Sequence, residues 1–362
     1  MGKKVVVGMS GGVDSSVAAY LLKEQGYEVI GVTMQIWQSE TQCEVEKKGG
    51  CCGISAVEDA RRVAEVLDIP YYVMNFRAEF KRDVIDYFVR EYRLGRTPNP
   101  CIACNRYVKW EALLTRSLML GADYIATGHY ARVLTLENGR YALASSKTAA
   151  KDQSYALYNL TQRQLAHTLM PIGEYEKPEV RAIAAAAGLP VAAKPDSQEI
   201  CFVPDGDYAH FIDESTGERA LPGNFVRADG TVLGEHKGLT HYTVGQRKGL
   251  GIAFGEPMYV IELRPEQNEV VLGTGDEVYA EELLAGDVNW MAVAPPPAGE
   301  TLCCRAKIRY NHGGADCSVT VLPDGKIRVV FPTPQRAVTP GQAVVLYTDS
   351  GAVLGGGTIE AE

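Results

Sequence analysis

The first informative segment of the chain reads Val5-Val6-Val7-Gly8-Met9-Ser10-Gly11-Gly12-Val13-Asp14-Ser15-Ser16. Its β-branched residues predict a short buried strand, and the pattern over residues 13–25 predicts a helix. A glycine-rich turn that leads into a helix brings backbone N–H groups and the positive end of the helix macrodipole to one point. The segment therefore predicts a phosphate-binding loop. A tight glycine turn with a serine cap is the simpler alternative.

Two common phosphate loops do not match this segment. The Walker A loop requires a lysine after the glycines, and the dinucleotide-binding loop requires the pattern G-x-G-x-x-G; neither occurs here. The acidic side chain within the loop, Asp14, would be repelled by a bound polyphosphate unless a divalent cation lay between them. This repulsion predicts Mg²⁺ as a cofactor.

Strand and helix patterns alternate through the first half of the chain. The expected strands cover residues 4–7, 27–34, 71–76 and 124–127, and the expected helices cover residues 13–25, 55–67, 84–91, 108–120 and 178–187. Such alternation is typical of an α/β fold with a parallel sheet that helices cover on both faces.

The pattern changes to β structure after about residue 205. Turn signals at Asp229-Gly230 and Asp324-Gly325 separate valine-rich runs such as residues 327–331 and 343–347. We therefore expect a parallel-sheet domain followed by a small central domain and a C-terminal β barrel or sandwich. The predicted boundaries are residues 1–205, 206–280 and 281–362.

Composition limits the classes of function. The chain has 36 Lys and Arg against 45 Asp and Glu, a net charge of −9, so any contact with nucleic acid must be local. No apolar run reaches the roughly 18 residues of a membrane span, and the run at residues 5–7 is too short for an export signal. Nine cysteines at irregular spacing favour thiol chemistry or metal binding in a cytoplasmic protein.

Residues 10–15 resemble the signature of the PP-loop ATP pyrophosphatases, which cleave ATP between the α and β phosphates and adenylate an oxygen. The resemblance implies that ATP binds at this loop, with Met34 beside the adenine and Gly128 as a further contact. The loop residues so implied are Gly8, Met9, Ser10, Gly11, Gly12, Val13, Asp14 and Ser15.

Two cysteine segments indicate which family within this superfamily the chain resembles. One reads Pro98-Asn99-Pro100-Cys101-Ile102-Ala103-Cys104-Asn105 and the other Asp196-Ser197-Gln198-Glu199-Ile200-Cys201-Phe202. They resemble the two cysteine segments of the tRNA-specific 2-thiouridylases, the enzymes that convert the wobble uridine of tRNA to 2-thiouridine. Further segments match in the family's order: Gly128-His129-Tyr130-Ala131, Lys151-Asp152-Gln153-Ser154-Tyr155, Thr243-Val244-Gly245-Gln246-Arg247-Lys248-Gly249 and Lys307-Ile308-Arg309-Tyr310. The resemblance thus spans nearly the whole chain.

The resemblance implies a mechanism in which adenylation makes the C2 oxygen of the uridine a leaving group. Cys201 would carry a persulfide delivered by a cysteine desulfurase or a sulfur-relay protein. Cys104 would attack its inner sulfur, release sulfide and leave a Cys104–Cys201 disulfide. Arg106, Lys109 and Lys194 would lower a cysteine pKa if they fold nearby.

The resemblance also implies which residues contact the RNA. Asn99, Pro100 and Cys101 would surround a target base that is flipped out of the anticodon loop. The remaining tRNA contacts, through phosphate pairing and stacking, would come from His129, Lys151, Asp152, Gln153, Arg309, Tyr310 and Gln342.

The chain departs from the commoner family pattern at Cys101, where that pattern has aspartate. The change creates Cys101-x-x-Cys104, which with Cys201 supplies three thiolates. Three cysteines would leave one iron of a [4Fe–4S] cluster open to bind hydrosulfide directly. Zinc is less favoured because no fourth ligand is evident. The persulfide route and the cluster route both remain open from the sequence.

The sequence also bears on the remaining cysteines and on two alternative functions. Cys43, Cys51 and Cys52 favour a loop that packs on the domain over a metal site or regulatory disulfide, and Cys303, Cys304 and Cys317 favour core packing. An ATP-dependent ligase such as a lysidine-type synthetase would share the loop without needing paired cysteines. A metal or redox binding module without turnover is the third alternative, and the intact loop argues against it.

Overall fold

The computed structural model describes residues 2–36, 54–148, 151–195, 200–252 and 255–361. The chain forms two compact units. The first comprises Met1–Val84, Cys101–Gly206 and Ser350–Leu354, and the second comprises Ile85–Pro100, Asp207–Asp349 and Gly355–Glu362. Cys43, Cys51 and Cys52 lie outside the described residues.

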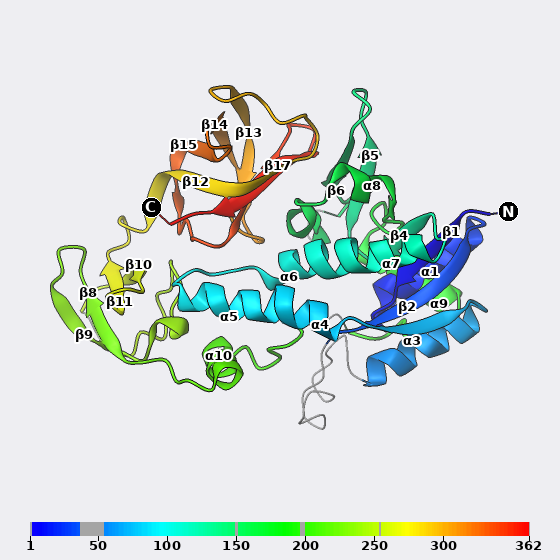
Figure 1. The fold of residues 1–362 in the computed structure, drawn as a ribbon, viewed down its shortest axis with the longest axis horizontal. Helices are drawn as coiled ribbons and strands as arrows, with labels where there is room; N and C mark the ends of the chain where they lie inside the picture. Colours follow the sequence, from blue (N-terminus) through cyan, green and yellow to red (C-terminus); the bar gives the residue numbers. More distant parts are fainter. Residues whose placement is uncertain (1, 37–53, 149–150, 196–199, 253–254, 362) are drawn as a thin grey trace. The chain divides into compact units, whose positions relative to one another are not determined.

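The first unit is built on a parallel sheet with the strand order β3-β2-β1-β4-β7 (Figure 1). Its strands are β1 (Lys4–Gly8), β2 (Glu28–Gln35), β3 (Tyr71–Asn75), β4 (Tyr124–Thr127) and β7 (Thr168–Leu169). Val5, Val6 and Val7 are almost fully buried because β1 is an inner strand of this sheet. The predicted parallel sheet is confirmed.

Three helices pack near this sheet: α1 (Val13–Glu24), α3 (Ile54–Val66) and α9 (Lys177–Ala186). The apolar face of α1 and the apolar residues of α9 meet in one core cluster that includes Val17, Leu22, Val180 and Ala184. Helix α9 begins beside Pro178, and Gly188 follows its end with φ of 66°, as the sequence predicted.

The helical structure around the first cysteine segment begins earlier than predicted. The sequence pattern indicated a helix over residues 108–120, whereas the structure has α6 (Pro100–Ala103), a π-helical segment Cys104–Leu113 and α7 (Leu114–Met119). Pro100 is compatible with a first helical turn, where a missing N–H costs little. Similarly, α4 (Arg77–Phe80) and a π-helical turn, Lys81–Ile85, precede α5 (Asp86–Arg93), where a helix was expected only at 84–91.

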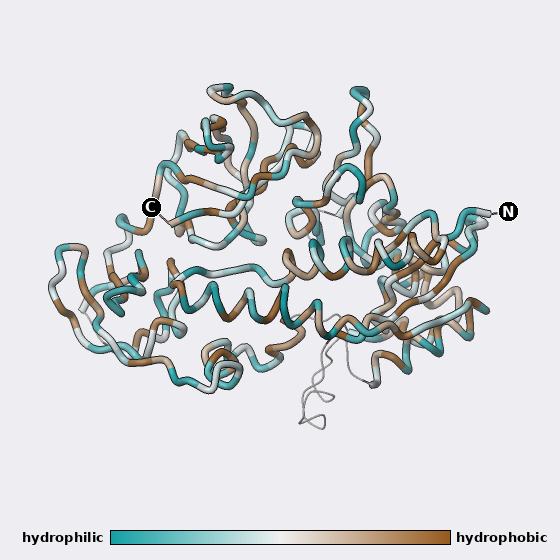
Figure 2. The backbone as a smooth tube through the Cα atoms, in the orientation of Figure 1, coloured by the Kyte–Doolittle hydropathy of each residue, from teal (hydrophilic) through white to brown (hydrophobic). Residues whose placement is uncertain are grey.

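A hairpin of β5 (Ala131–Thr135) and β6 (Tyr141–Ser145) follows the sheet and was not predicted. Figure 2 shows hydrophilic colour at the tip of this hairpin and hydrophobic stretches along the strands of the sheet. After the hairpin come a 3₁₀ turn, Ser154–Leu157, and α8 (Gln162–Ala166), which a reciprocal Thr161–Gln164 capping box begins.

The second unit contains α10 (Tyr208–Thr216) and a four-stranded sheet ordered β10-β11-β8-β9. Its strands are β8 (Gly223–Val226), β9 (Val232–His236), β10 (Tyr259–Arg264) and β11 (Glu269–Gly273). The predicted turn at Asp229-Gly230 joins β8 to β9, with Gly230 at φ of 86°. Phe225, Tyr242 and Val260 lie in the core of this sheet.

The same unit contains the predicted C-terminal barrel, which is closed in the order β12-β15-β14-β13-β16-β17. Its strands are β12 (Tyr279–Trp290), β13 (Thr301–Lys307), β14 (Ala315–Val321), β15 (Ile327–Arg336), β16 (Ala343–Tyr347) and β17 (Val353–Ile359). Cys304 and Cys317 are buried opposite each other, as predicted, but Cys303 points outward and is exposed, because neighbouring residues of a strand face opposite sides.

Of the helices in the described part of the chain, none combines the length and hydropathy that a membrane crossing requires.

The end of β4 touches the beginning of α1 at Gly128, where a Cβ atom would lie 2.5 Å from the backbone nitrogen of Ser15. Replacing Gly128 with alanine is therefore expected to lower the free energy of unfolding of the first unit by about 1–3 kcal/mol. Gly8→Ala, at the end of the neighbouring strand β1, is the matched control because its Cβ would meet its neighbours at an ordinary 3.8 Å. Urea unfolding followed by circular dichroism compares the two variants, and equal losses would contradict the packing explanation.

Candidate active site

The predicted phosphate loop joins β1 to α1 and is held by its own serines. The Ser10 backbone N–H donates to Ser15 Oγ over 3.2 Å, and Ser16 Oγ donates to the Gly12 carbonyl over 2.8 Å. Gly12 is the N-cap of α1 and provides no side-chain acceptor for the N–H groups of the first turn. In a loop of this form, those N–H groups remain available to bind an anion.

Packing against neighbouring segments determines which residues can occupy the phosphate loop and which of its atoms a ligand can reach. Gly11 has φ of 67°, and a Cβ atom there would collide with the carbonyl oxygen of Ala56. Met9 and Val13 point into the core, so only their backbones are available to a ligand. Met34, which the family resemblance places beside adenine, is half-buried near the carboxyl end of β2. Ligands bind at this edge of parallel α/β sheets.

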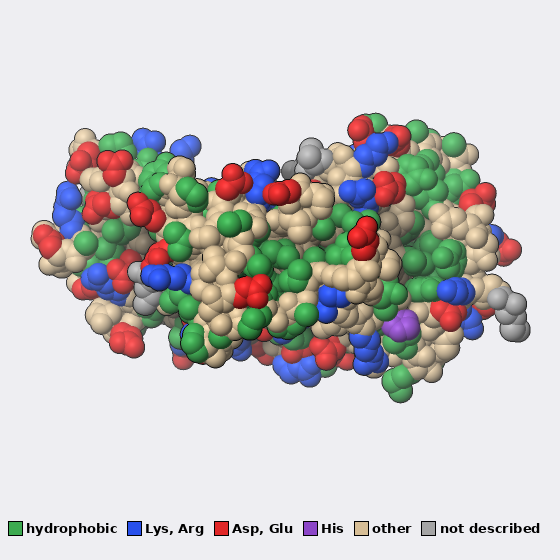
Figure 3. All heavy atoms as spheres, turned by 90° about the horizontal axis from the view of Figure 1, so that it is seen from above, with side chains coloured by type: hydrophobic (Ala, Val, Ile, Leu, Met, Phe, Trp, Pro, Cys, Tyr) green, Lys and Arg blue, Asp and Glu red, His purple; other side chains and the backbone are tan. Residues whose placement is uncertain are grey.

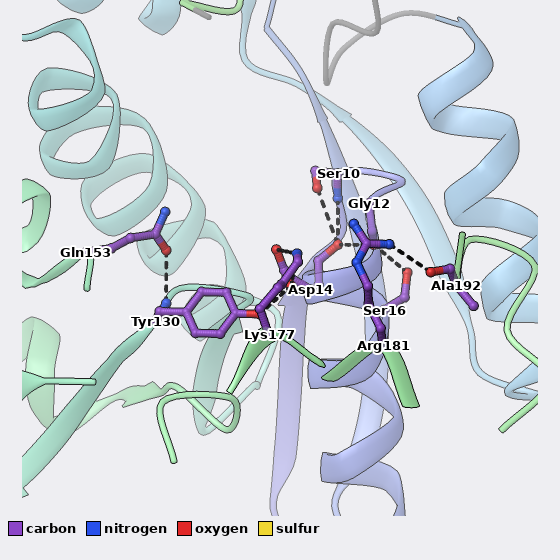
Figure 4. A network of polar contacts seen from close by, with 10 residues as sticks. Ser10, Gly12, Asp14, Ser16, Tyr130, Gln153, Lys177, Arg181 and Ala192 are labelled. Atoms are coloured by element: carbon purple, nitrogen blue, oxygen red, sulfur yellow. Dashed lines mark hydrogen bonds and ion pairs between the residues drawn. The ribbon is translucent and has the colours of Figure 1, made fainter. Parts of the chain in front are cut away.

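The Asp14 carboxylate is held by two side chains from distant parts of the chain (Figure 4). Lys177 Nζ lies 2.8 Å from both Oδ1 and Oδ2, and the Tyr130 hydroxyl donates to Oδ1 over 2.8 Å. The Lys177 side chain is 13% exposed and that of Asp14 29%. The sequence argument for Mg²⁺ rested on an unbalanced Asp14, but an ammonium group of the chain itself already balances this carboxylate.

Sequence reasoning missed Lys177, which lies 163 residues from Asp14. The only signal near it was Pro178, which predicts the start of a helix but not the direction of the preceding side chain. A second lysine also contacts the loop: Lys194 Nζ donates to the Gly11 carbonyl over 2.9 Å and to Asp59 Oδ2 over 2.7 Å. Lys194 was proposed as a neighbour of a cysteine, and its hydrogen bonds show it at the phosphate loop.

The segment predicted to contact tRNA through residues 151–153 is joined to the same loop. Gln153 Oε1 accepts from the Tyr130 N–H over 2.9 Å, and the Gln153 N–H donates to the Tyr130 carbonyl over 2.9 Å. The Asp152 carboxylate accepts from Ser145 Oγ, Ser154 Oγ and two backbone N–H groups. Asp152 and Gln153 therefore order this turn from within, while Lys151 is exposed.

His129 follows β4 and lies against the π-helical segment that begins at Cys104. Its Nε2 is 3.5 Å from Lys109 Nζ and its Nδ1 is 2.8 Å from Thr127 Oγ1. Burial, and then the positive charge of Lys109, lower the pKa of His129 well below its ordinary value. Because an ammonium can only donate, a neutral His129 accepts at Nε2 and carries its proton on Nδ1.

The cysteine segment is anchored by Asn105, the residue after Cys104. Asn105 Nδ2 donates to the Ala156 carbonyl and Oδ1 accepts from Lys109 Nζ, both over 2.8 Å. Lys109 is thus engaged with Asn105 and His129, and Arg106 lies over the Tyr107 ring at 5.1 Å. These contacts place the lysine beside the cysteine segment but direct its ammonium to other partners.

The three cysteines of the predicted site are all in the first unit. Cys101 is exposed, and Cys104 and Cys201 are half-buried. Within the described residues, which include all three, no group of three or more His, Cys, Asp or Glu side chains is arranged to hold a metal ion.

The remaining predicted RNA contacts lie in the second unit. Asn99 is half-buried and Pro100 is buried, while Tyr310 is 43% exposed. Arg309 Nη1 donates to the Arg336 carbonyl over 2.9 Å, and Gln342 Nε2 donates to the Thr97 carbonyl over 2.8 Å. On the face in Figure 3, acidic and basic side chains are interspersed, consistent with local rather than general attraction of a polyanion.

Models of protein families match three consecutive segments. Residues 3–205 match a model described as a tRNA methyl transferase HUP domain, and residues 209–274 one described as a tRNA methyl transferase PRC-barrel domain. Residues 280–359 match an aminomethyltransferase beta-barrel domain.

Relatives that match over their full length carry a different name from the family models. A protein of Lachnoclostridium phytofermentans named tRNA-specific 2-thiouridylase MnmA is 68% identical over 357 residues, 99% of each chain. The chain belongs to the tRNA-specific 2-thiouridylase family. Members of the same name from Acetivibrio thermocellus and Clostridium kluyveri are 58% and 55% identical, over 99% and 100% of each chain. In this 2-thiouridylase family member, the phosphate loop, Cys104 and Cys201 lie in the same unit of the fold.

The lowered pKa of His129 gives a testable pH dependence. The unfolded chain takes up a proton on this histidine near its ordinary pKa of about 6.5, and the folded chain does not, so His129 makes stability fall as pH falls below about 6.5. Histidine NMR resonances, with His129→Gln used for assignment, should show a His129 titration midpoint well below the ordinary histidine value of about 6.5. Lys109→Met should raise the pKa of His129 because it removes a nearby positive charge, but burial should still keep this pKa below the ordinary value. A His129 midpoint near 6.5 in the unsubstituted protein would contradict the neutral assignment.

Proposed function

We propose that this chain converts the wobble uridine of tRNA to 2-thiouridine in an ATP-dependent reaction. The observation that carries the proposal is the presence, in one compact unit, of an ordered phosphate loop and two cysteines flanked by the family's motifs. The names of the full-length relatives support the same reaction. As a sulfurtransferase it would require both an activated oxygen and a sulfur nucleophile.

Activation of the oxygen is assigned to the phosphate loop. The backbone N–H groups at the start of α1 would bind the phosphates of ATP, with Gly8 to Ser15, Met34 and Gly128 as the nucleotide contacts. The C2 oxygen of uridine would attack the α phosphate, release pyrophosphate and become part of an AMP ester. Mg²⁺ would come with ATP and reduce the charge of the phosphates.

Sulfur transfer is assigned to the two cysteines. A persulfide on Cys201 would receive its outer sulfur from a cysteine desulfurase or a sulfur-relay protein. The Cys104 thiolate would attack Sγ of Cys201, so that the persulfide S–S bond breaks, hydrosulfide leaves and a Cys104–Cys201 disulfide forms. Hydrosulfide would then displace AMP from C2, and an external dithiol would reduce the disulfide for the next turnover.

The cluster route is not the one we propose. It requires Cys101, Cys104 and Cys201 as joint ligands, and these residues are described without forming such a set. We therefore derive no step through an iron–sulfur cluster and interpret Cys101 as a neighbour of the target base, together with Asn99 and Pro100.

RNA binding is assigned to residues in both units. We propose that residues 1–205 hold ATP and the flipped base, while residues 206–280 and 281–362 form two further domains that bind the tRNA stem. Lys151, with Asp152 and Gln153 ordering its turn, would contact the tRNA beside His129. Arg309, Tyr310 and Gln342 would contact it from the barrel. We expect the enzyme to act in the cytoplasm.

The decisive experiment measures 2-thiouridine in unmodified tRNA by mass spectrometry after anaerobic incubation with ATP and a persulfide donor. Cys104→Ser and Cys201→Ser are each expected to lower its formation at least about 100-fold, because each removes a thiolate required for sulfur transfer. Cys303→Ser, which replaces an exposed cysteine of the barrel, is the matched control and should retain activity.

Two outcomes would refute parts of this proposal. ATP-dependent modification of tRNA that survives both substitutions would favour a ligase of the lysidine type. Iron and acid-labile sulfide near four per chain in the anaerobic protein, with activity supported by sulfide alone, would replace the persulfide route by the cluster route.

A further inference from the structure

We infer that Lys177 and Tyr130 are positioning residues of the nucleotide site, and that the Lys177 ammonium balances the charge of Asp14 so that a polyphosphate can approach the loop. The inference rests on the proposed function only in taking ATP as the ligand. It concerns residues outside the loop and the cysteine segments, and it begins from the contacts that hold the Asp14 carboxylate.

The position of Lys177 is determined by the helix that it begins. Lys177 is the first residue of α9, and a reciprocal capping box between Glu176 and Glu179 defines that start, with the Glu176 N–H 2.6 Å from Glu179 Oε2. Val180 and Ala184 on the same helix are fully buried in the core cluster that contains the apolar face of α1. Because α9 and α1 pack together, Lys177 reaches Asp14 in the first turn of α1.

The Asp14–Lys177 pair is bidentate and partly shielded from water, since the two side chains are 29% and 13% exposed. A partly shielded pair interacts more strongly than a fully solvated one, and loss of one partner leaves the other charge uncompensated. Removal of the ammonium would leave a carboxylate at the end of the helix that binds the phosphates. Repulsion between that carboxylate and ATP would then weaken ATP binding.

Tyr130 orients the same carboxylate without contributing charge. Its hydroxyl donates to Asp14 Oδ1, its ring is 3% exposed, and the Lys177 ammonium lies 5.8 Å from the ring centroid. Two hydrogen bonds to Gln153 hold its backbone. Figure 4 shows the resulting chain of contacts from Gln153 through Tyr130 to Asp14 and Lys177. Loss of the Tyr130 hydroxyl removes one hydrogen bond and no charge, so its effect should be smaller than that of losing Lys177.

The test is the dissociation constant of ATP, measured by isothermal titration calorimetry in excess Mg²⁺ on the full chain. Lys177→Met is expected to raise it about tenfold or more, Tyr130→Phe about threefold, and Lys177→Arg should stay within about threefold of the unsubstituted protein because it keeps the charge. Lys147→Met is the matched control, since Lys147 forms a looser, more exposed pair with Glu179 of the same helix at 3.9 Å.

Melting temperatures separate positioning from a general structural role. Weakened ATP binding in Lys177→Met, with restored binding in Lys177→Arg and a melting temperature within a few degrees, would support the inference. Unchanged ATP affinity in Lys177→Met would overturn the inference. So would a loss of affinity in both Lys177→Arg and Lys147→Met as large as that in Lys177→Met. If Lys177→Met does not fold, Lys177→Gln is judged by the same criteria. Failure of the unsubstituted chain to bind ATP would instead refute the proposed function.

Discussion

The structure depends on how closely other backbone segments approach the amino end of α1. Gly11 lies against the carbonyl oxygen of Ala56, and Gly128 lies against the backbone of Asp14 and Ser15. At both positions a Cβ atom would force the neighbouring segment away. These contacts bring the ends of β1 and β4 and the start of α3 together around one turn, and the candidate ATP site is the result of that convergence.

Charge is balanced locally in this acidic chain. The net charge of −9 would oppose both ATP and tRNA if it acted as an even field. Near the phosphate loop, however, Lys177 and Lys194 come from segments far along the chain and pair with Asp14 and with Asp59 and the Gly11 carbonyl. A polyanion that reaches this loop therefore meets backbone N–H groups and paired carboxylates rather than the average charge of the protein.

The outcome of sequence reasoning differed between kinds of feature. Periodicity predicted the strands of the parallel sheet and the barrel, because burial imposes a repeat on apolar residues. It missed the β5–β6 hairpin and placed the helix near Cys104 too late, because short or irregular elements carry little periodic signal. The family resemblance assigned Asp152 and Gln153 to RNA contact, and in the structure their hydrogen bonds order the turn and hold Tyr130. Motifs identify which residues belong to a site but not the partners that each will find.

The sequence alone determined the phosphate loop, the α/β and barrel architecture and the family, because local spacing and short motifs encode these features. The pairing of Asp14 with Lys177, the lowered pKa of the buried His129 beside Lys109 and the exposure of Cys101, Cys104 and Cys201 follow only from the folded arrangement of the chain. These facts depend on distances and burial between residues that are remote in the chain. A pKa or an ion pair is a property of such an environment, which no local pattern of residues specifies.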